Sequence, residues 1–271
     1  MKARVTWIFL AAPIVAHAGF DSNGRGSRPI SLANTYVAIA DDPWAVVYNP
    51  AGLARILDVR VAAFVSPAQF GMAELRTASV GAVVPSHVCT GGVVIDQFGY
   101  ELYKETVASF GVGKTVNEWI SFGVAIHCAR FAIEHYGTET RWLCDAGGIA
   151  SVTEDIRIGC CWKNITQTTI GSHSEQLPQI LTMGVCYEIN QHSRLTMELE
   201  KDIRYPFIKK FGYEQQIFDI LSVRLGVSDN PDKFALGFGV RVGGVDFSYA
   251  GYSHPQLGWT HQVEMSFTIM P

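Results

Sequence analysis

A few charged residues occupy alternate positions in stretches that are otherwise apolar or small. In a strand, alternate positions share one face, so these charges would lie together on the polar faces of their strands. On a soluble protein they would form a solvated surface. Inside a closed barrel they would point inward, where they could pair for packing or shape a path for a solute, and packing is the stronger expectation. The candidates are Glu198, Glu200, Arg224, Arg241, Asp246 and Glu264.

No pattern of a known catalytic chemistry accompanies these charges. The sequence has no Gly-x-Ser-x-Gly, no His-Glu-x-x-His and no complete phosphate-binding glycine loop. The stretch GVGKT at 111–115 lacks the spacing and the following helix of a phosphate loop, so we interpret it as a strand end and turn. The eight histidines are scattered, without a pair at metal-ligand spacing. We therefore expect no enzyme activity, no cofactor and no metal.

The first residues predict export. Lys2 and Arg4 precede an apolar run, Val5 to Val15, and Ala16-His17-Ala18 fits a cleavage site with small residues. We expect a signal peptide over residues 1–18. A retained membrane anchor is the weaker alternative, because the run is shorter than the ~20 residues of a spanning helix and contains Pro13.

The composition restricts where the apolar surface of the chain can go. Charged residues make up 17% of the sequence, against about 25% in soluble proteins. The net charge of −4 gives no indication of nucleic-acid binding. No later stretch reaches ~18 consecutive apolar residues, so no spanning helix is predicted. The apolar residues must form a large core or face lipid.

Six cysteines are present, and an exported protein could oxidise them. None forms a Cys-x-x-Cys pair, and most lie within apolar, strand-like runs, so we favour small buried or lipid-facing side chains. A zinc site lacks supporting spacing. The residues are Cys89, Cys128, Cys144, Cys160, Cys161 and Cys186.

From about residue 59 onward, the chain repeats stretches of alternating residues separated by turns. About thirteen such stretches follow residue 58, and turns such as SDNPD at 228–232 read as hairpins. SHSEQLP at 172–178 is the most loop-like stretch. In DKFALGFGVRVGG one face carries Phe234, Leu236, Phe238, Val240 and Val242, and the other carries Ala235, Gly237, Gly239, Arg241 and Gly243.

Two architectures bury such a pattern: a soluble β-sandwich, or a transmembrane β-barrel with apolar faces toward lipid. The polar faces are rich in Gly, Ala and Ser, which suits a crowded lumen. Aromatic residues gather near the predicted strand ends, as in interfacial girdles. Only a closed barrel satisfies every backbone group in lipid. We predict an all-β, closed antiparallel barrel over 58–271, of about fourteen strands with twelve possible, since bacterial barrels have even counts.

Residues 19–57 follow a different pattern. Asp41 or Asp42 can cap a short helix that starts near Pro43, and Pro50 disfavours helix at Asn49, so that a second helical piece can begin there. Two short helices with apolar faces ahead of a barrel predict a hatch, a segment folded inside it. A periplasmic cap or a simple lead-in is the alternative. The candidate hatch motif is Asp41, Asp42, Trp44, Tyr48, Asn49, Pro50, Ala51, Gly52 and Leu53.

Both ends of the chain contain motifs of a known family. SRPISLANTYVAIADDPWAVVYNPAGLA resembles the N-terminal motif of the long-chain fatty-acid outer-membrane transporter (FadL) superfamily. The matching residues are Ala38, Ala40, Asp41, Asp42, Asn49, Pro50, Ala51, Gly52 and Leu53. The C-terminal strands are similar to the PorV/PorQ branch, and short FadL-like proteins of spirochaete outer membranes also look similar. There the matches are Arg224, Gly226, Asp246, Tyr249, Leu257, Gly258, Thr260 and His261.

The resemblance implies a fourteen-stranded barrel in the bacterial outer membrane with an inward-folded N-terminal hatch. It implies passage of small hydrophobic, fatty-acid-like molecules as the leading function. A non-transporting component of a secretion system, as in the PorV/PorQ branch, or a structural outer-membrane protein is the alternative. The expected partners are outer-membrane lipid, with hydrophobic small molecules or lipids and secretion-system proteins as further candidates, and no nucleic acid.

Overall fold

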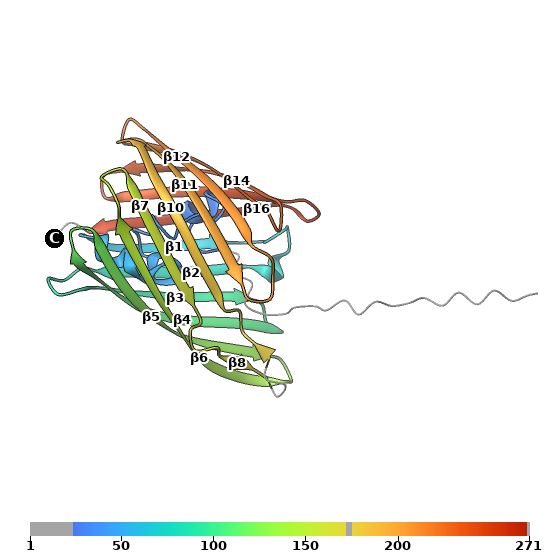
Figure 1. Ribbon diagram of the computed structural model, residues 1–271. Helices are drawn as coiled ribbons and strands as arrows, with labels where there is room; N and C mark the ends of the chain where they lie inside the picture. The colour runs from blue at the N-terminus through green and yellow to red at the C-terminus, as the bar shows by residue number, and fades with distance from the viewer. Residues whose placement is uncertain (1–23, 172–174, 270–271) are drawn as a thin grey trace, which may run out of the picture.

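The computed structural model describes residues 24–171 and 175–269. Fourteen strands form one closed barrel, in which each strand pairs antiparallel with its neighbours and β1 closes on β16 (Figure 1). This confirms the predicted all-β barrel, with fourteen strands rather than twelve. The expected signal peptide at 1–18 lies outside the described residues.

The barrel strands follow one another around the wall in chain order, except that β10 pairs with β7. They are β1 (Val59–Ser66), β2 (Thr77–Val84), β3 (Thr90–Gly99), β4 (Tyr103–Asn117), β5 (Ile120–Ile133), β6 (Gly137–Ser151), β7 (Ile156–Lys163), β10 (Ile180–Asn190), β11 (Ser193–Asp202), β12 (Ile208–Ile217), β13 (Leu221–Ser228), β14 (Lys233–Val242), β15 (Val245–His254) and β16 (Gly258–Ile269).

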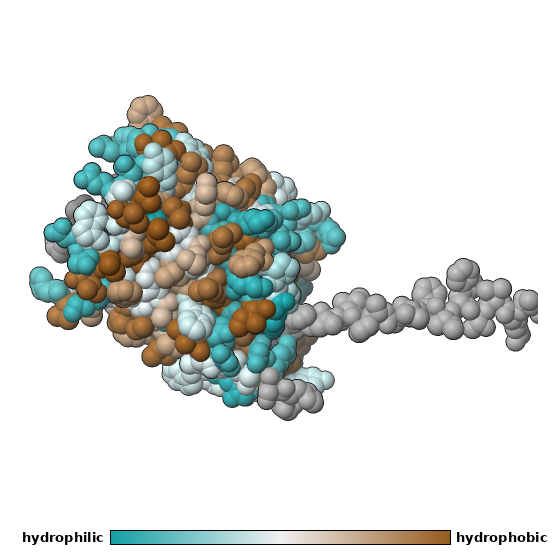
Figure 2. Space-filling view, viewed as in Figure 1, coloured by the Kyte–Doolittle hydropathy of each residue, from teal (hydrophilic) through white to brown (hydrophobic). Residues whose placement is uncertain are grey.

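Alternation along each strand separates an apolar outer face from a small or charged inner face. In β13, Val223, Leu225 and Val227 are exposed outward, whereas Arg224 is buried inside. Figure 2 shows apolar residues over much of the visible wall. Such an outer surface suits contact with lipid better than contact with water. Separately, none of the helices in the described part of the chain is long and apolar enough to cross a membrane.

The wall is continuous but its ladders differ in length. β5 and β6 pair from Ile120↔Ala150 to Ile133↔Gly137, whereas β6 and β7 pair only from Ala146↔Trp162 to Ser151↔Arg157. Beyond that point residues 164–171 run beside β6 and bond to it irregularly, as in Ile165 N–H to Cys144 O at 2.8 Å. A small hairpin of β8 (Thr169–Ile170) and β9 (Glu175–Gln176) follows, within the region where sequence indicated mainly loop.

All six cysteines are free. Cys161 and Cys186 are buried, Cys160 is exposed, and the other three are half-buried. Their positions in or beside barrel strands agree with the interpretation as small side chains.

Residues 24–56, which we call the inner segment, lie inside the barrel (Figure 1). The segment contains α1 (Ser27–Ser31), α2 (Ala45–Tyr48) and the 3-10 helix η1 (Pro50–Arg55); a further 3-10 helix, η2 (Ala73–Leu75), lies outside it. α2 and η1 correspond to the two pieces expected on either side of Asn49, whereas α1 lies in a stretch for which sequence predicted no helix. The segment supplies much of the apolar core, including Trp44, Tyr36 and Leu53.

The inner segment fits because glycines line the wall where its backbone passes. A Cβ at Gly123 would lie 2.2 Å from the carbonyl carbon of Pro50, and a Cβ at Gly159 would lie 2.3 Å from Val37 O. Neither distance leaves room for a side chain. On nine strands a glycine lies this close to backbone or side-chain atoms of the inner segment, and together we call them the glycine belt: Gly92, Gly113, Gly123, Gly147, Gly159, Gly184, Gly212, Gly226 and Gly237.

We predict that Gly123→Ala destabilises the barrel by about 2 kcal/mol, because the added methyl meets fixed backbone rather than a flexible side chain. Gly91→Ala is the matched control, since its Cβ meets nothing within 4 Å. Urea unfolding in lipid, followed by tryptophan fluorescence, measures both free energies of unfolding. Equal stability of the two variants would contradict a tight fit at the belt.

Candidate functional site

Asn49 ties the inner segment both to itself and to the wall. Its side-chain amide donates to Val37 O at 2.7 Å and to Gly148 O of β6 at 3.2 Å. Its Oδ1 accepts from Ala51 N–H at 3.1 Å. This hydrogen bond caps η1, which begins at Pro50. A buried amide with three backbone partners is well satisfied and specifies one position for the chain.

Among the described residues, Trp44 is the largest fully buried side chain, and Glu264 of β16 binds it. The indole N–H donates to Glu264 Oε1 at 3.0 Å, and Ser27 N–H donates to Glu264 Oε2. The Trp44 ring also packs edge-on against Phe64 of β1. Glu264 therefore anchors α1 and the start of α2 at the same point of the wall.

A second cluster of charges lies around Arg28. The guanidinium pairs with Asp41 and, through two hydrogen bonds of 3.0 Å, with Glu214 of β12. Arg224 also binds Glu214, at 2.7 Å. Burial alone would raise the pKa of Asp41, but Arg28 and Arg194 outweigh burial and lower it. Paired charges of this kind tolerate burial because each retains its partners.

The pKa of Asp42 shifts in the direction opposite to that of Asp41. Tyr36 donates its hydroxyl to Asp42 Oδ2 at 2.6 Å, and Trp44 N–H donates to Oδ1 at 2.9 Å. No cation binds it directly among the described residues. Burial, followed by repulsion from Glu264 and then Asp41, raises its pKa from 3.8 to about 7 despite the attraction of Arg28.

Glu198 connects the inner segment to a third cluster of charges, formed with Lys210 and Glu200. Its Oε2 accepts from Tyr36 N–H at 2.9 Å and Val37 N–H at 3.0 Å, and its Oε1 pairs with Lys210 at 3.1 Å. Lys210 also binds Glu200 at 2.6 Å.

The candidate residues named from sequence fall into three places. The nine hatch-motif residues all lie within the inner segment, and Glu198, Arg224 and Glu264 meet that segment or its ion pairs. Glu200 lines a cavity at one end of the barrel. Arg241 and Asp246 pair with each other at 2.7 Å beside the exposed β14–β15 turn, away from the inner segment.

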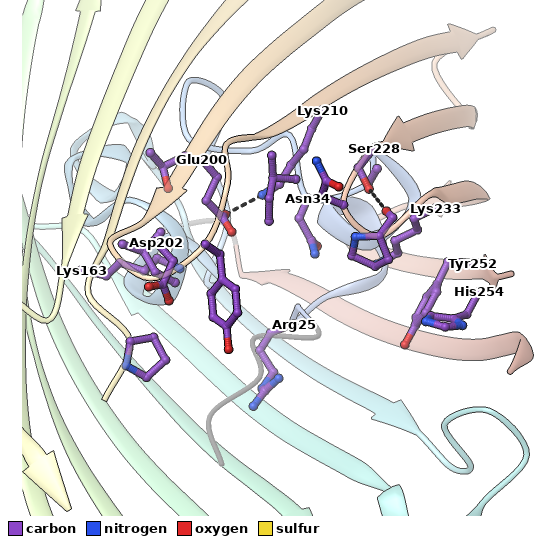
Figure 3. Close-up of a pocket in the computed structure, with 18 of the residues that line it drawn as sticks. Arg25, Asn34, Lys163, Glu200, Asp202, Lys210, Ser228, Lys233, Tyr252 and His254 are labelled. Atoms are coloured by element: carbon purple, nitrogen blue, oxygen red, sulfur yellow. Dashed lines mark hydrogen bonds and ion pairs between the residues drawn. The ribbon is translucent and has the colours of Figure 1, made fainter. Parts of the chain in front are cut away.

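That cavity, the mouth cavity, has a volume of about 790 Å³. Its walls include the β1–β2, β13–β14 and β15–β16 connections, and its floor is Asn34, Val37 and Tyr48 of the inner segment. Figure 3 shows Lys163 and Lys233 on opposite sides, with Glu200 and Lys210 joined between them.

The two flanking lysines lie against aromatic rings. Lys233 Nζ is 3.8 Å from the centre of the Tyr252 ring, and Lys163 Nζ is 5.4 Å from that of Tyr48. Rings stabilise an ammonium by cation–π attraction and also provide apolar surface. The mouth cavity therefore offers both apolar contacts and positive charge.

Several site residues were not predicted. Lys210 and Glu214 alternate with Phe211 and Tyr213 on β12, so the same pattern that identified Glu198 would have found them. Arg25 and Arg28 lie in a glycine-rich stretch without periodicity, and no sequence signal marks them. Among the described residues, no three His, Cys, Asp or Glu side chains group as a metal site.

Solved structures show what this fold is similar to. A toluene transporter of P. putida, TodX, superposes with a TM-score of 0.72 at 11% identity, over 93% of this chain and 100% of that one. TbuX, the toluene transporter of Ralstonia pickettii, gives 0.70 at 14% identity, over 92% and 98%. A Pseudomonas aeruginosa FadL homologue gives 0.64 at 11% identity, over 90% and 96%.

These likenesses establish the fold. Neither a protein-family model nor a curated protein matches the sequence.

We predict that Asp42→Asn changes how stability depends on pH. Because the folded-state pKa of Asp42 is raised, its favourable contribution is complete below about pH 4 and is lost as the pH rises through about 7. The variant should be close in stability to the wild type at pH 4 and exceed it by up to about 4 kcal/mol at pH 8, because each pH unit between the two pKa values is worth about 1.4 kcal/mol. Unfolding midpoints of both proteins across this range measure the difference, and a constant difference would refute the assignment.

Proposed function

We propose that this chain is an outer-membrane barrel through which small hydrophobic molecules cross the membrane, and that it belongs to the FadL superfamily. The mouth cavity carries the proposal, because it leads from one end of the barrel to the inner segment and is lined by aromatic side chains. The apolar outer wall supports placement in a membrane. The names of structural neighbours, toluene transporters among them, support the class of solute.

In this proposal the inner segment acts as the hatch. The solute enters the mouth cavity, rests on Val37 and Tyr48, and continues when the hatch shifts or yields beside the wall. Lys163 favours amphiphiles whose head group is acidic, as in a fatty acid, because its ammonium faces a ring and binds no carboxylate within 4 Å in the described residues.

A structural or secretion role, as in the PorV/PorQ branch, is the second candidate. The glycine belt favours it, since a segment so closely fitted resembles a permanent filling more than a movable hatch. In that case the mouth cavity would receive a partner segment rather than a solute.

We predict that Ser228→Trp slows solute uptake into proteoliposomes at least about threefold, because the indole fills part of the mouth cavity. Val227→Trp is the matched control, since the adjacent side chain points outward and is 45% exposed. Uptake of radiolabelled decanoate and toluene is compared with that of empty vesicles.

If the wild-type protein admits neither solute faster than empty vesicles do, the transport proposal fails. Recovery of a stable protein complex from detergent-solubilised outer membranes would then favour the second candidate.

A further inference from the structure

Charges on the barrel strands are divided between the two faces of the wall. The carboxylates of these strands occupy inward positions, as Asp96, Glu198 and Glu264 do. In the described strands, the charged residues at outward positions are all cations. They are Lys104, Lys114, Arg130, Lys201 and Lys209. A wall whose outward charges are all positive is suited to contact with anionic groups.

Most of these cations lie at the mouth end, the end of the barrel that holds the mouth cavity. Lys104 lies near the start of β4 and Arg130 near the end of β5. Lys201 and Lys209 lie on either side of the β11–β12 connection, which also lines the mouth cavity. Lys114 lies toward the opposite end of β4.

In an outer membrane, the mouth end is the side that faces out of the cell. Bacterial barrels have short turns toward the periplasm and longer loops outside. The connections at 67–76 and 164–179 are the longest between successive barrel strands, and both lie at the mouth end. The cations at this end would therefore meet the head groups of the outer leaflet.

Lys104 and Arg130 are the two cations at the mouth end that are available to a ligand. Arg130 is exposed and Lys104 is half-buried, and neither side chain has an ion pair or hydrogen bond with the described residues. The other pair is already engaged, since Lys209 lies 3.9 Å from Asp229 and Lys201 donates to a backbone carbonyl.

The strand register places two hydroxyls beside this free pair. Arg130 is opposite Thr106 of β4 and opposite Thr140 of β6, and Lys104 is on the same face, two residues before Thr106. Directly opposite residues are about 5 Å apart and diagonal ones about 7–8 Å, so the two long side chains can reach one phosphate group. Glu134, in the turn beyond, already pairs with a neighbouring histidine. A guanidinium, an ammonium and hydroxyls are suitable donors to phosphate oxygens.

Apolar side chains cover the wall directly beneath these polar groups. Ala108, Cys128 and Trp142 are the next outward residues toward the middle of the barrel and lie opposite one another, followed by Phe110 and Ile126. Trp142 is 63% exposed and Phe110 is 53% exposed. This surface suits acyl chains, with a tryptophan at the level of the interface. A free phosphate ion would leave it uncovered, so the arrangement favours a lipid.

We propose that Lys104 and Arg130, assisted by Thr106 and Thr140, bind the phosphate of an anionic lipid in the outer leaflet, with its acyl chains over Trp142. The inference goes beyond passage of a solute, because it concerns the outer wall and rests only on placement in a membrane. Binding is measured on the purified barrel, so its failure is distinguishable from failure of transport.

The test offers the detergent-solubilised barrel equal amounts of phosphatidylglycerol and phosphatidylcholine with the same acyl chains. Both lipids have a phosphate, but choline cancels its charge. Native mass spectrometry measures how much of each lipid is bound. One cation near an anionic lipid surface is worth about fivefold in affinity, so we expect at least about a fivefold preference for phosphatidylglycerol. Arg130→Gln and Lys104→Gln should each lower this preference at least about twofold, and the double variant should remove most of it.

Lys114→Gln is the matched control, because it removes one outward cation from the other end of β4 and should leave the preference unchanged. Heat-modifiable gel migration verifies that each variant is folded. Equal binding of the two lipids by the wild type, or the same preference in Arg130→Gln as in Lys114→Gln, would overturn the proposal. Displacement of the lipid by millimolar inorganic phosphate would indicate a site for a free anion and would overturn it as well.

Discussion

The close approach between the glycine belt and the inner segment is the constraint on which the rest of the structure depends. A fourteen-stranded barrel encloses more space than its own inward side chains of Gly, Ala and Ser can fill. The inner segment fills part of that space with backbone and with large side chains such as Trp44 and Leu53. The small inward residues of the wall and the large side chains of the inner segment therefore depend on each other. The space between the inner segment and one end of the barrel forms the mouth cavity.

Carboxylates of the wall also hold the inner segment in place. Backbone N–H groups of the inner segment need acceptors once water is excluded, and wall carboxylates supply them: Glu198 accepts from Tyr36 and Val37, and Glu264 accepts from Ser27. These carboxylates come from β11 and β16, on separate parts of the wall. The segment is therefore fixed at several points, which is a stronger restraint than any one ion pair would provide.

Sequence predicted the wall better than the interior. Strict alternation, as in β13, fixes which residues face outward, and the turn residues fix where strands end. The proline and the capping asparagine in Asn49-Pro50 marked the break between two helical pieces. Which side chains meet inside the lumen depends on the position of each strand around the barrel and on the height of each residue along the barrel axis. Alternation of apolar and polar residues along one strand does not encode either. Arg28 reaching Glu214, 186 positions later, is such a case, and so is the mouth cavity.

The short ladder between β6 and β7 has a mechanical consequence. Backbone bonds across a seam share a load, so the resistance of a wall to stretching varies with the number of bonds at each seam. Along most of β6 the load beside β7 falls on isolated bonds such as Ile165 to Cys144 and Arg141 to Thr169. When the surrounding membrane is tensed or thinned, we expect this seam to deform before the longer ladders on either side of β5 do.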